Sequence, residues 1–140
     1  MNNQNITISV IIIGYNTKNY LVGLLHSIKK QNISIPQKNI EIIYVDDGSN
    51  DGSIEIFRSF PLNFKKKHFR FIKNSGRNIA TQKGVDMSEN SWLLFLRSNV
   101  VLSSNIINEY VKSILKYSAV AFMGKIIYKS EDVVFEKYLN

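Results

Sequence analysis

Two nearly continuous β-branched segments, separated by an amphipathic stretch, constrain the fold of this chain more than any other feature. They are ITISVIIIGY (6–15) and IEIIYV (40–45). Strands that are apolar on both faces are typical of parallel sheets with helices covering both sides. Residues 16–32 between them have a helical pattern with one apolar stripe, formed by Tyr20, Leu21, Leu24, Leu25 and Ile28. The segment therefore predicts a strand–helix–strand unit.

The alternation of strands and helices continues along the rest of the chain. The expected elements are a short helix (53–60), a third strand (69–73), a helix (77–88), a central fourth strand (91–96), a helix (103–118), a fifth strand (119–128) and a last element (129–140). No repeat or linker divides them. The pattern predicts one domain, residues 1–140, of the α/β class, with a mainly parallel central sheet between layers of helices.

The composition is that of a soluble globular domain. Of the 140 residues, 44% are hydrophobic and 21% are charged, and there is no cysteine. No apolar run reaches the roughly 18 residues of a membrane-spanning helix, and the polar N-terminus does not resemble a signal peptide. These observations predict a cytoplasmic location and exclude a disulfide framework.

The net charge is +7, and the one dense cluster of basic residues is the segment FKKKHFR (64–70). We expect it to form a solvated loop before a strand. Peripheral attraction to the inner face of an anionic membrane through Lys65, Lys66 and Lys67 is the alternative. No nucleic-acid-binding motif accompanies the charge, so nucleic acid is not expected as a partner.

Polar clusters follow three of the predicted strands. They are Tyr15 with Asn16, the acidic turn 46–51, and the segment 97–99. Ligands of open parallel sheets bind at the carboxyl ends of the strands. The sequence therefore predicts a binding site where these clusters meet.

The acidic turn VDDGSNDGS (45–53) fits several kinds of site poorly. As a calcium loop starting at Asp47, it would place Arg58 where a bidentate glutamate is needed. A phospho-accepting domain would carry its acidic pair after the first strand and an aspartate at the position of Arg97. Neither a G-x-G-x-x-G nor a G-K-[ST] phosphate loop is present. The remaining interpretation is a turn into a helix whose carboxylates accept hydrogen bonds from a ligand.

Four ordered blocks resemble family 2 glycosyltransferases of the GT-A fold. They are ISVIIIGYN (8–16), IEIIYVDDGSNDGS (40–53), NSGRNIATQKG (74–84) and WLLFLRSNVVL (92–102). The resemblance implies a Rossmann-like, three-layer α/β/α domain, truncated relative to the family, that binds a nucleotide-diphosphate sugar of the UDP or dTDP type. The implied activity is inverting sugar transfer to an acceptor in the synthesis of cell-surface polysaccharide or glycan.

The resemblance also implies site residues. Those expected to bind the nucleotide are Tyr15, Asn16, Asp46, Asp47, Gly48, Ser49, Asn74, Gly76 and Arg77. Those at the diphosphate and metal position are Arg97, Ser98 and Asn99.

The chain departs from the family at the metal position. The family has aspartates and a Mn²⁺ or Mg²⁺ ion there, whereas this chain has Arg97, Ser98 and Asn99, of which Asn99 alone is a weak candidate ligand. Arg97 either pairs with phosphate oxygens or is a solvent-facing or salt-bridged residue without a role.

The catalytic base of the family comes from later segments, so the catalytic residues of this chain are unknown. The alternative function is a catalytically inactive module that binds a nucleotide sugar or a partner. A second copy or another protein is then expected to supply the missing acceptor half.

Overall fold

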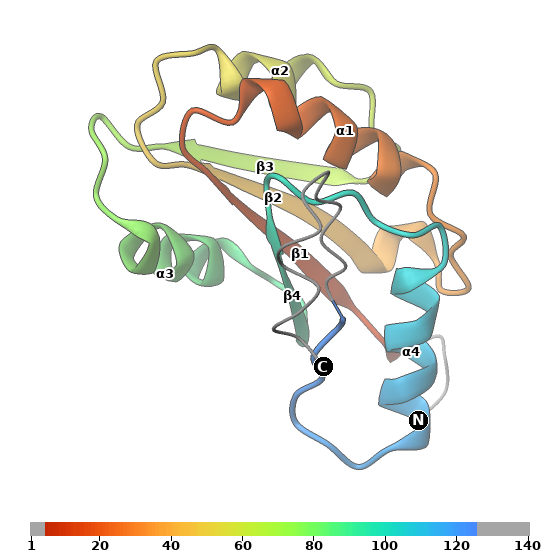
Figure 1. Ribbon diagram of the computed structural model, residues 1–140. Helices are drawn as coiled ribbons and strands as arrows, with labels where there is room; N and C mark the ends of the chain where they lie inside the picture. The colour runs from red at the N-terminus through yellow and green to blue at the C-terminus, as the bar shows by residue number, and fades with distance from the viewer. Residues whose placement is uncertain (1–4, 126–140) are drawn as a thin grey trace, which may run out of the picture.

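Four parallel strands form the central sheet of the computed structural model, which describes residues 5–125 (Figure 1). They are β1 (Ile8–Gly14), β2 (Ile40–Asp46), β3 (Lys65–Arg70) and β4 (Trp92–Arg97). Their order across the sheet is β3-β2-β1-β4, and every neighbouring pair is parallel. The predicted α/β class is confirmed.

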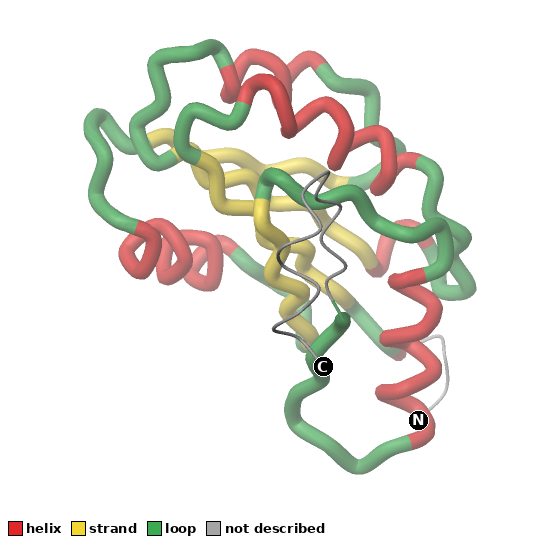
Figure 2. Tube along the Cα trace, viewed as in Figure 1, coloured by secondary structure: helices red, strands yellow, loops and turns green. Residues whose placement is uncertain are grey.

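Helices lie on both faces of the sheet, which gives the predicted three layers (Figures 1 and 2). One face carries α1 (Lys18–Lys29), α2 (Ser53–Ser59) and α4 (Ile106–Lys116), and the other carries α3 (Arg77–Met87). A short 3₁₀ helix (Gln37–Asn39) leads into β2.

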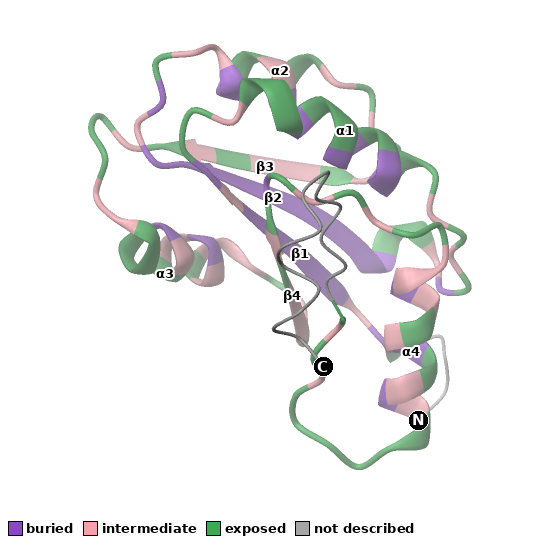
Figure 3. Cartoon of the chain, viewed as in Figure 1, coloured by how far each residue is buried: buried purple, intermediate pink, exposed green. Residues whose placement is uncertain are grey.

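Alternate residues of the inner strands β1 and β2 face two separate apolar clusters. Ile8, Val10 and Ile12 of β1 pack toward α1, while Ile11 packs toward α3. Both strands are buried along almost their whole length, in contrast to β3 and β4 (Figure 3). The β-branched runs were therefore correctly interpreted as strands covered on both faces.

The outer strands differ from the prediction. The third strand is Lys65–Arg70 rather than 69–73, so the basic segment is itself a strand and not a loop. The fourth strand is an outer strand of the described sheet, because β1 and β2 occupy its centre. In the expected fifth strand, residues 119–125 have no strand structure, whereas 126–128 and the expected last element 129–140 lie outside the described residues.

The lysines of β3 have partners within the fold. Lys67 Nζ lies 2.9 Å from Glu41 Oε2 and 2.8 Å from Glu89 Oε1, and Lys65 Nζ lies 2.5 Å from Glu89 Oε2. Lys66 Nζ donates to backbone carbonyls at the end of α2, including that of Phe60 at 2.8 Å. Membrane contact through these lysines stays a prediction; between residues 5 and 125 no helix is long and apolar enough to cross a bilayer.

Glu41 is a buried carboxylate on β2 that three groups hold in its ionised form. Ser9 Oγ donates to Oε1 at 2.6 Å, and so does the Glu89 backbone N–H at 2.8 Å. Burial by itself raises the pKa of Glu41, but the Ser9 hydrogen bond and the Lys67 ammonium outweigh it and hold the pKa below its ordinary value of 4.5. The charged form of Glu41 therefore stabilises the folded chain.

Replacing the Glu41 carboxylate should make the free energy of unfolding depend less on pH under acidic conditions. The contribution of Glu41 is fully present above its ordinary pKa and is lost as the pH falls through its lower folded-state pKa. We expect Glu41→Gln to reduce the free energy of unfolding at pH 7 by about 1–3 kcal/mol and to weaken its pH dependence below about pH 5. Urea unfolding at several pH values measures both effects. Glu55→Gln, at an exposed position on α2, is the control, and an equal response of the two variants would contradict this account.

Gly84 lets α3 pack closely on β1. A Cβ at this position would lie 2.5 Å from Cγ2 of Ile11, which is fully buried. We expect Gly84→Ala to lower the free energy of unfolding by about 1–3 kcal/mol, because overpacking outweighs the gain in helix propensity. Gly23→Ala on α1 is the matched control, since its Cβ would be 3.7 Å from the nearest side chain. Gly23→Ala should be neutral or stabilising in the same urea titration, and stabilisation by both changes would refute the packing argument.

Candidate functional site

A cleft of about 560 Å³ lies at the carboxyl ends of β1 and β4, on the face of the sheet that carries α3. It is formed by three parts of the chain: β1 with the loop after it, the start of α3, and the end of β4. The lining residues are Ile11, Ile13, Gly14, Tyr15, Asn16, Thr17, Tyr20, Asp47, Asn74, Arg77, Thr81, Phe95, Leu96, Arg97, Ser98 and Asn99. The polar clusters that follow the first, second and fourth strands therefore meet, as the parallel-sheet rule predicts.

The floor of the cleft is apolar and its rim is aromatic. Ile13 and Phe95 contribute to the floor, and Phe95 is 51% exposed. Tyr15 and Tyr20 lie at the rim and are 50% and 60% exposed. Exposed aromatic rings around an apolar floor suit a planar ring such as a nucleobase.

The loop after β1 is fixed to the acidic turn by hydrogen bonds. The Asn16 backbone N–H donates to Ser49 Oγ at 2.8 Å, and Asn16 Oδ1 accepts from the Asn50 N–H at 3.0 Å. The Lys18 N–H donates to Asp51 Oδ2 at 2.9 Å. Asp51 thus holds the start of α1, in addition to accepting from the Ser53 N–H at the start of α2.

Asp46 lies inside the acidic turn and does not line the cleft. It is fully buried, and its Oδ1 accepts from the Ser49 backbone N–H at 3.0 Å and from the Ser49 hydroxyl. Its Oδ2 lies 3.7 Å from Arg70 Nε. A nucleotide contact by Asp46 stays a prediction.

Gly48 allows the turn to pass close to the loop before α3. Its φ of +82° lies in the left-handed region, and a Cβ would be 2.5 Å from the carbonyl carbon of Lys73. Gly48 and Ser49 therefore shape the turn from behind the cleft wall, and their predicted contact with a nucleotide stays untested.

Asp47, by contrast, lines the cleft and holds the start of α3. Its Oδ1 accepts from the Ser75 N–H at 2.7 Å, and its Oδ2 accepts from the Gly76 N–H at 3.0 Å. Gly76 is the N-cap residue of α3. The carboxylate therefore occupies the positive end of a helix and places Asn74 and Arg77 at the cleft.

Two arginines bring positive charge to the cleft. Arg77 is the first residue of α3, Arg97 is the last residue of β4, and both are exposed. Neither guanidinium has a hydrogen bond or ion pair with any residue from 5 to 125. The salt-bridged alternative for Arg97 therefore has no partner in that part of the chain, and the guanidinium is free to meet a ligand.

The residues at the predicted metal position do not fit a divalent cation. Asp47 is the only carboxylate among the described lining residues, and both of its oxygens accept backbone hydrogen bonds. Within residues 5–125, no group of three or more His, Cys, Asp and Glu side chains could hold a metal ion. Asn99 contributes a neutral amide two residues from the Arg97 cation, whereas Mn²⁺ and Mg²⁺ favour carboxylate ligands.

Eight of the described lining residues were not among the predicted site residues: Ile11, Ile13, Gly14, Thr17, Tyr20, Thr81, Phe95 and Leu96. Tyr20 was placed on the apolar stripe of its helix but is largely exposed. The alternation of β4 was the available signal for Phe95, because every second residue of that strand faces α3. Ser98 lines the cleft but is largely buried.

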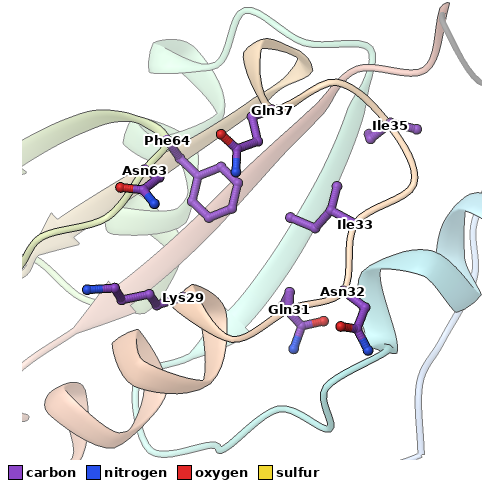
Figure 4. Close-up of a pocket in the computed structure, with 8 residues that line it drawn as sticks. All are labelled: Lys29, Gln31, Asn32, Ile33, Ile35, Gln37, Asn63 and Phe64. Atoms are coloured by element: carbon purple, nitrogen blue, oxygen red, sulfur yellow. The ribbon is translucent and has the colours of Figure 1, made fainter.

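A smaller cavity of about 320 Å³ lies at the opposite end of the sheet, between the α1–β2 connection and the segment before β3 (Figure 4). Lys29 is its one charged lining residue in the described chain. The Gln31 amide is already engaged, because Nε2 donates to the Ser103 carbonyl at 2.7 Å and Oε1 accepts from the Ile107 N–H at 3.2 Å. The cleft at the carboxyl ends is therefore the stronger candidate site.

Comparison with known proteins identifies the family. The model of glycosyl transferase family 2 matches residues 9–139, and the chain therefore belongs to that family. The family resemblance inferred from the four sequence blocks is confirmed.

Curated relatives of the chain are bacterial glycosyltransferases. Glycosyltransferase GlyA of Streptococcus pneumoniae serotype 4 is 32% identical over 117 residues, covering 84% of this chain and 16% of the relative. Glycosyltransferase GlyG of the same organism is 30% identical over 134 residues, covering 95% and 39%. The chain thus spans well under half the length of these relatives.

Solved structures show the same fold. Residues 1–349 of Staphylococcus aureus TarS in complex with UDP match with a TM-score of 0.72 and 25% identity over 79% of this chain and 32% of that one. The mannosyltransferase PcManGT of Pyrobaculum calidifontis, in complex with GDP-Man and Mn²⁺, matches with a TM-score of 0.69 and 15% identity over 81% and 32%. The GT-A fold is therefore confirmed.

The hydrogen bonds of Asp47 can be tested independently of any ligand. An amide in place of the carboxylate brings an N–H₂ group against one of the two backbone donors and removes the charge at the start of α3. We expect Asp47→Asn to lower the free energy of unfolding by about 1–2 kcal/mol and to speed hydrogen exchange of the Ser75 and Gly76 amides. The control is Asp86→Asn near the end of α3, where, among residues 5–125, the exposed carboxylate accepts only from Gln82 at 2.8 Å. Unchanged exchange at Ser75 and Gly76 would show that Asp47 does not hold this loop.

Proposed function

We propose that the chain is the donor-binding part of a glycosyltransferase, and that its cleft holds a nucleotide-diphosphate sugar. The observation that carries the proposal is the cleft at the carboxyl ends of β1 and β4. It combines an apolar floor, exposed tyrosines and two arginines that have no hydrogen-bond or ion-pair partner within residues 5–125. This combination offers surfaces for a base at one place and for phosphates at another. The TarS structures with UDP and with UDP-GlcNAc support a ligand of this class.

The nucleoside is assigned to the Tyr15 side of the cleft. The rings of Tyr15 and Tyr20 offer stacking surfaces, and each Asp47 oxygen has a second lone pair with which to accept from a base N–H. Asn74 also lines the cleft, and its amide can both donate and accept. UDP and dTDP sugars remain the expected donors.

The reaction is sugar transfer with inversion. An acceptor hydroxyl oxygen forms a bond to the anomeric carbon, the bond from that carbon to the diphosphate oxygen breaks, and the hydroxyl proton passes to a base. Asp47 is unsuited to be that base, because both of its oxygens are fixed by backbone amides. We therefore assign the base and the acceptor site to segments beyond residue 125, to a second copy or to a partner protein.

Cell-surface polymers are the proposed acceptor class. The minor teichoic acid biosynthesis protein GgaA of Bacillus subtilis is 40% identical over 103 residues, covering 69% of this chain and 22% of the relative. TarS is named as a poly(ribitol-phosphate) β-N-acetylglucosaminyltransferase. A teichoic acid in one name and poly(ribitol-phosphate) in the other agree with the family's expected role in polysaccharide synthesis.

Calorimetric titration with UDP, dTDP and GDP tests the proposal. We expect at least one of these nucleotides to bind, and Tyr15→Ala to weaken that binding about 5- to 100-fold through the loss of ring stacking. Tyr117→Ala is the matched control, because Tyr117 is similarly exposed, at 54%, but does not line the cleft. Failure of all three nucleotides to bind, or equal effects of the two tyrosine changes, would refute the proposed site.

A further inference from the structure

We propose that Arg97 and Arg77 bind the donor diphosphate directly and thereby replace the divalent cation that the family uses. The inference rests on the proposed function, because it assigns one part of the same cleft to one part of the ligand. It begins from a mismatch. The fold matches that of PcManGT, which was solved with Mn²⁺, but the cleft of this chain has an arginine where the family's metal ligands are expected.

The charges that line the cleft favour an anion. Among the described residues, two guanidinium groups and one carboxylate line the cleft, and the Asp47 carboxylate is already offset by two backbone amides at the positive end of α3. A Mn²⁺ or Mg²⁺ ion placed beside Arg97 would meet a like charge without the carboxylates that normally hold it. A diphosphate in the same place would meet the opposite charge of the guanidinium groups, which outnumber the single carboxylate of the described lining.

The two arginines reach the cleft from different elements. Arg97 ends β4 and pairs in register with Ile13 of β1, so it lies at the carboxyl edge of the sheet. Arg77 begins α3, whose start is fixed by Asp47. Guanidinium groups from two sides can each offer a planar pair of donors to phosphate oxygens, which fits the two phosphoryl groups of a nucleoside diphosphate.

Arg70 is an arginine with a structural role, and its contacts differ from those of Arg77 and Arg97. Its guanidinium donates to the Ser49 carbonyl, and its Nε lies 3.7 Å from Asp46 Oδ2. Arg77 and Arg97 have no such contacts within residues 5–125, although they line the same end of the sheet. Their donors are therefore available to an anionic ligand.

The test compares UDP with uridine, in EDTA and in MnCl₂, by calorimetry on the full 140-residue chain. We expect UDP to bind more tightly than uridine in EDTA, and Mn²⁺ to change the UDP affinity less than about 3-fold. Arg97→Gln and Arg77→Gln should each weaken UDP binding about 10-fold or more, in line with the loss of a charge-assisted hydrogen bond, and leave uridine binding unchanged.

Two further variants make the test specific. Arg97→Lys keeps the charge but loses the planar pair of donors, so its UDP affinity should lie between those of the unmodified chain and Arg97→Gln. Arg58→Gln on α2 is the matched control at an exposed arginine outside the cleft, and it should bind UDP normally. Circular dichroism establishes that each variant is folded.

The outcomes separate this inference from the proposed function. UDP binding that requires Mn²⁺, or an unchanged ratio of UDP to uridine affinity in Arg97→Gln and Arg77→Gln, would overturn the arginine assignment while leaving the nucleotide site intact. Absence of both UDP and uridine binding, together with absence of dTDP and GDP binding, would instead refute the site itself.

Discussion

The geometry of the cleft depends on the two hydrogen bonds that Asp47 accepts from the Ser75 and Gly76 amides. They join the end of β2 to the start of α3, the helix on the opposite face of the sheet from α1, α2 and α4. Because α3 packs on β1 through Gly84, its first residue Arg77 is fixed relative to the strand ends. Without this carboxylate, two backbone amides at the start of the helix would lose their partners. One side chain thus fixes the helix and forms part of the cleft wall.

The sequence predicted the centre of the sheet better than its edges, for a physical reason. The inner strands are buried on both faces, so their residues record that environment directly as β-branched runs. β3 contains three consecutive lysines, which look solvated unless their partners are known. Lys65 and Lys67 pair with Glu41 and Glu89, and Lys66 donates to backbone carbonyls at the end of α2. These partners lie in other parts of the chain, so the local sequence around the lysines does not indicate them.

The candidate site could be located from the sequence, but the orientation of its side chains could not. Parallel strands bring their carboxyl ends to one edge, so Tyr15, Asp47 and Arg97 were expected to meet. The adjacent residues Asp46 and Asp47 were both expected to bind the nucleotide. In the structure Asp46 is buried inside the turn, whereas Asp47 lines the cleft. Neighbouring residues of a strand point to opposite faces, but this rule applies only as far as the strand extends. The sequence did not show that β2 ends at Asp46, so it could not distinguish the two aspartates.

The hydrogen bonds between the loop after β1 and the acidic turn have a consequence for selectivity. A wall held by Asn16, Ser49 and Asp51 is already ordered before a ligand arrives, so binding there loses little conformational entropy. The guanidinium arms are long, exposed and unpaired within residues 5–125, and must be immobilised on contact. Discrimination between ligands should therefore come from the ordered wall formed by the loop after β1 and the acidic turn. The side chains of Arg77 and Arg97 can adjust to the phosphates when the position of the sugar changes slightly.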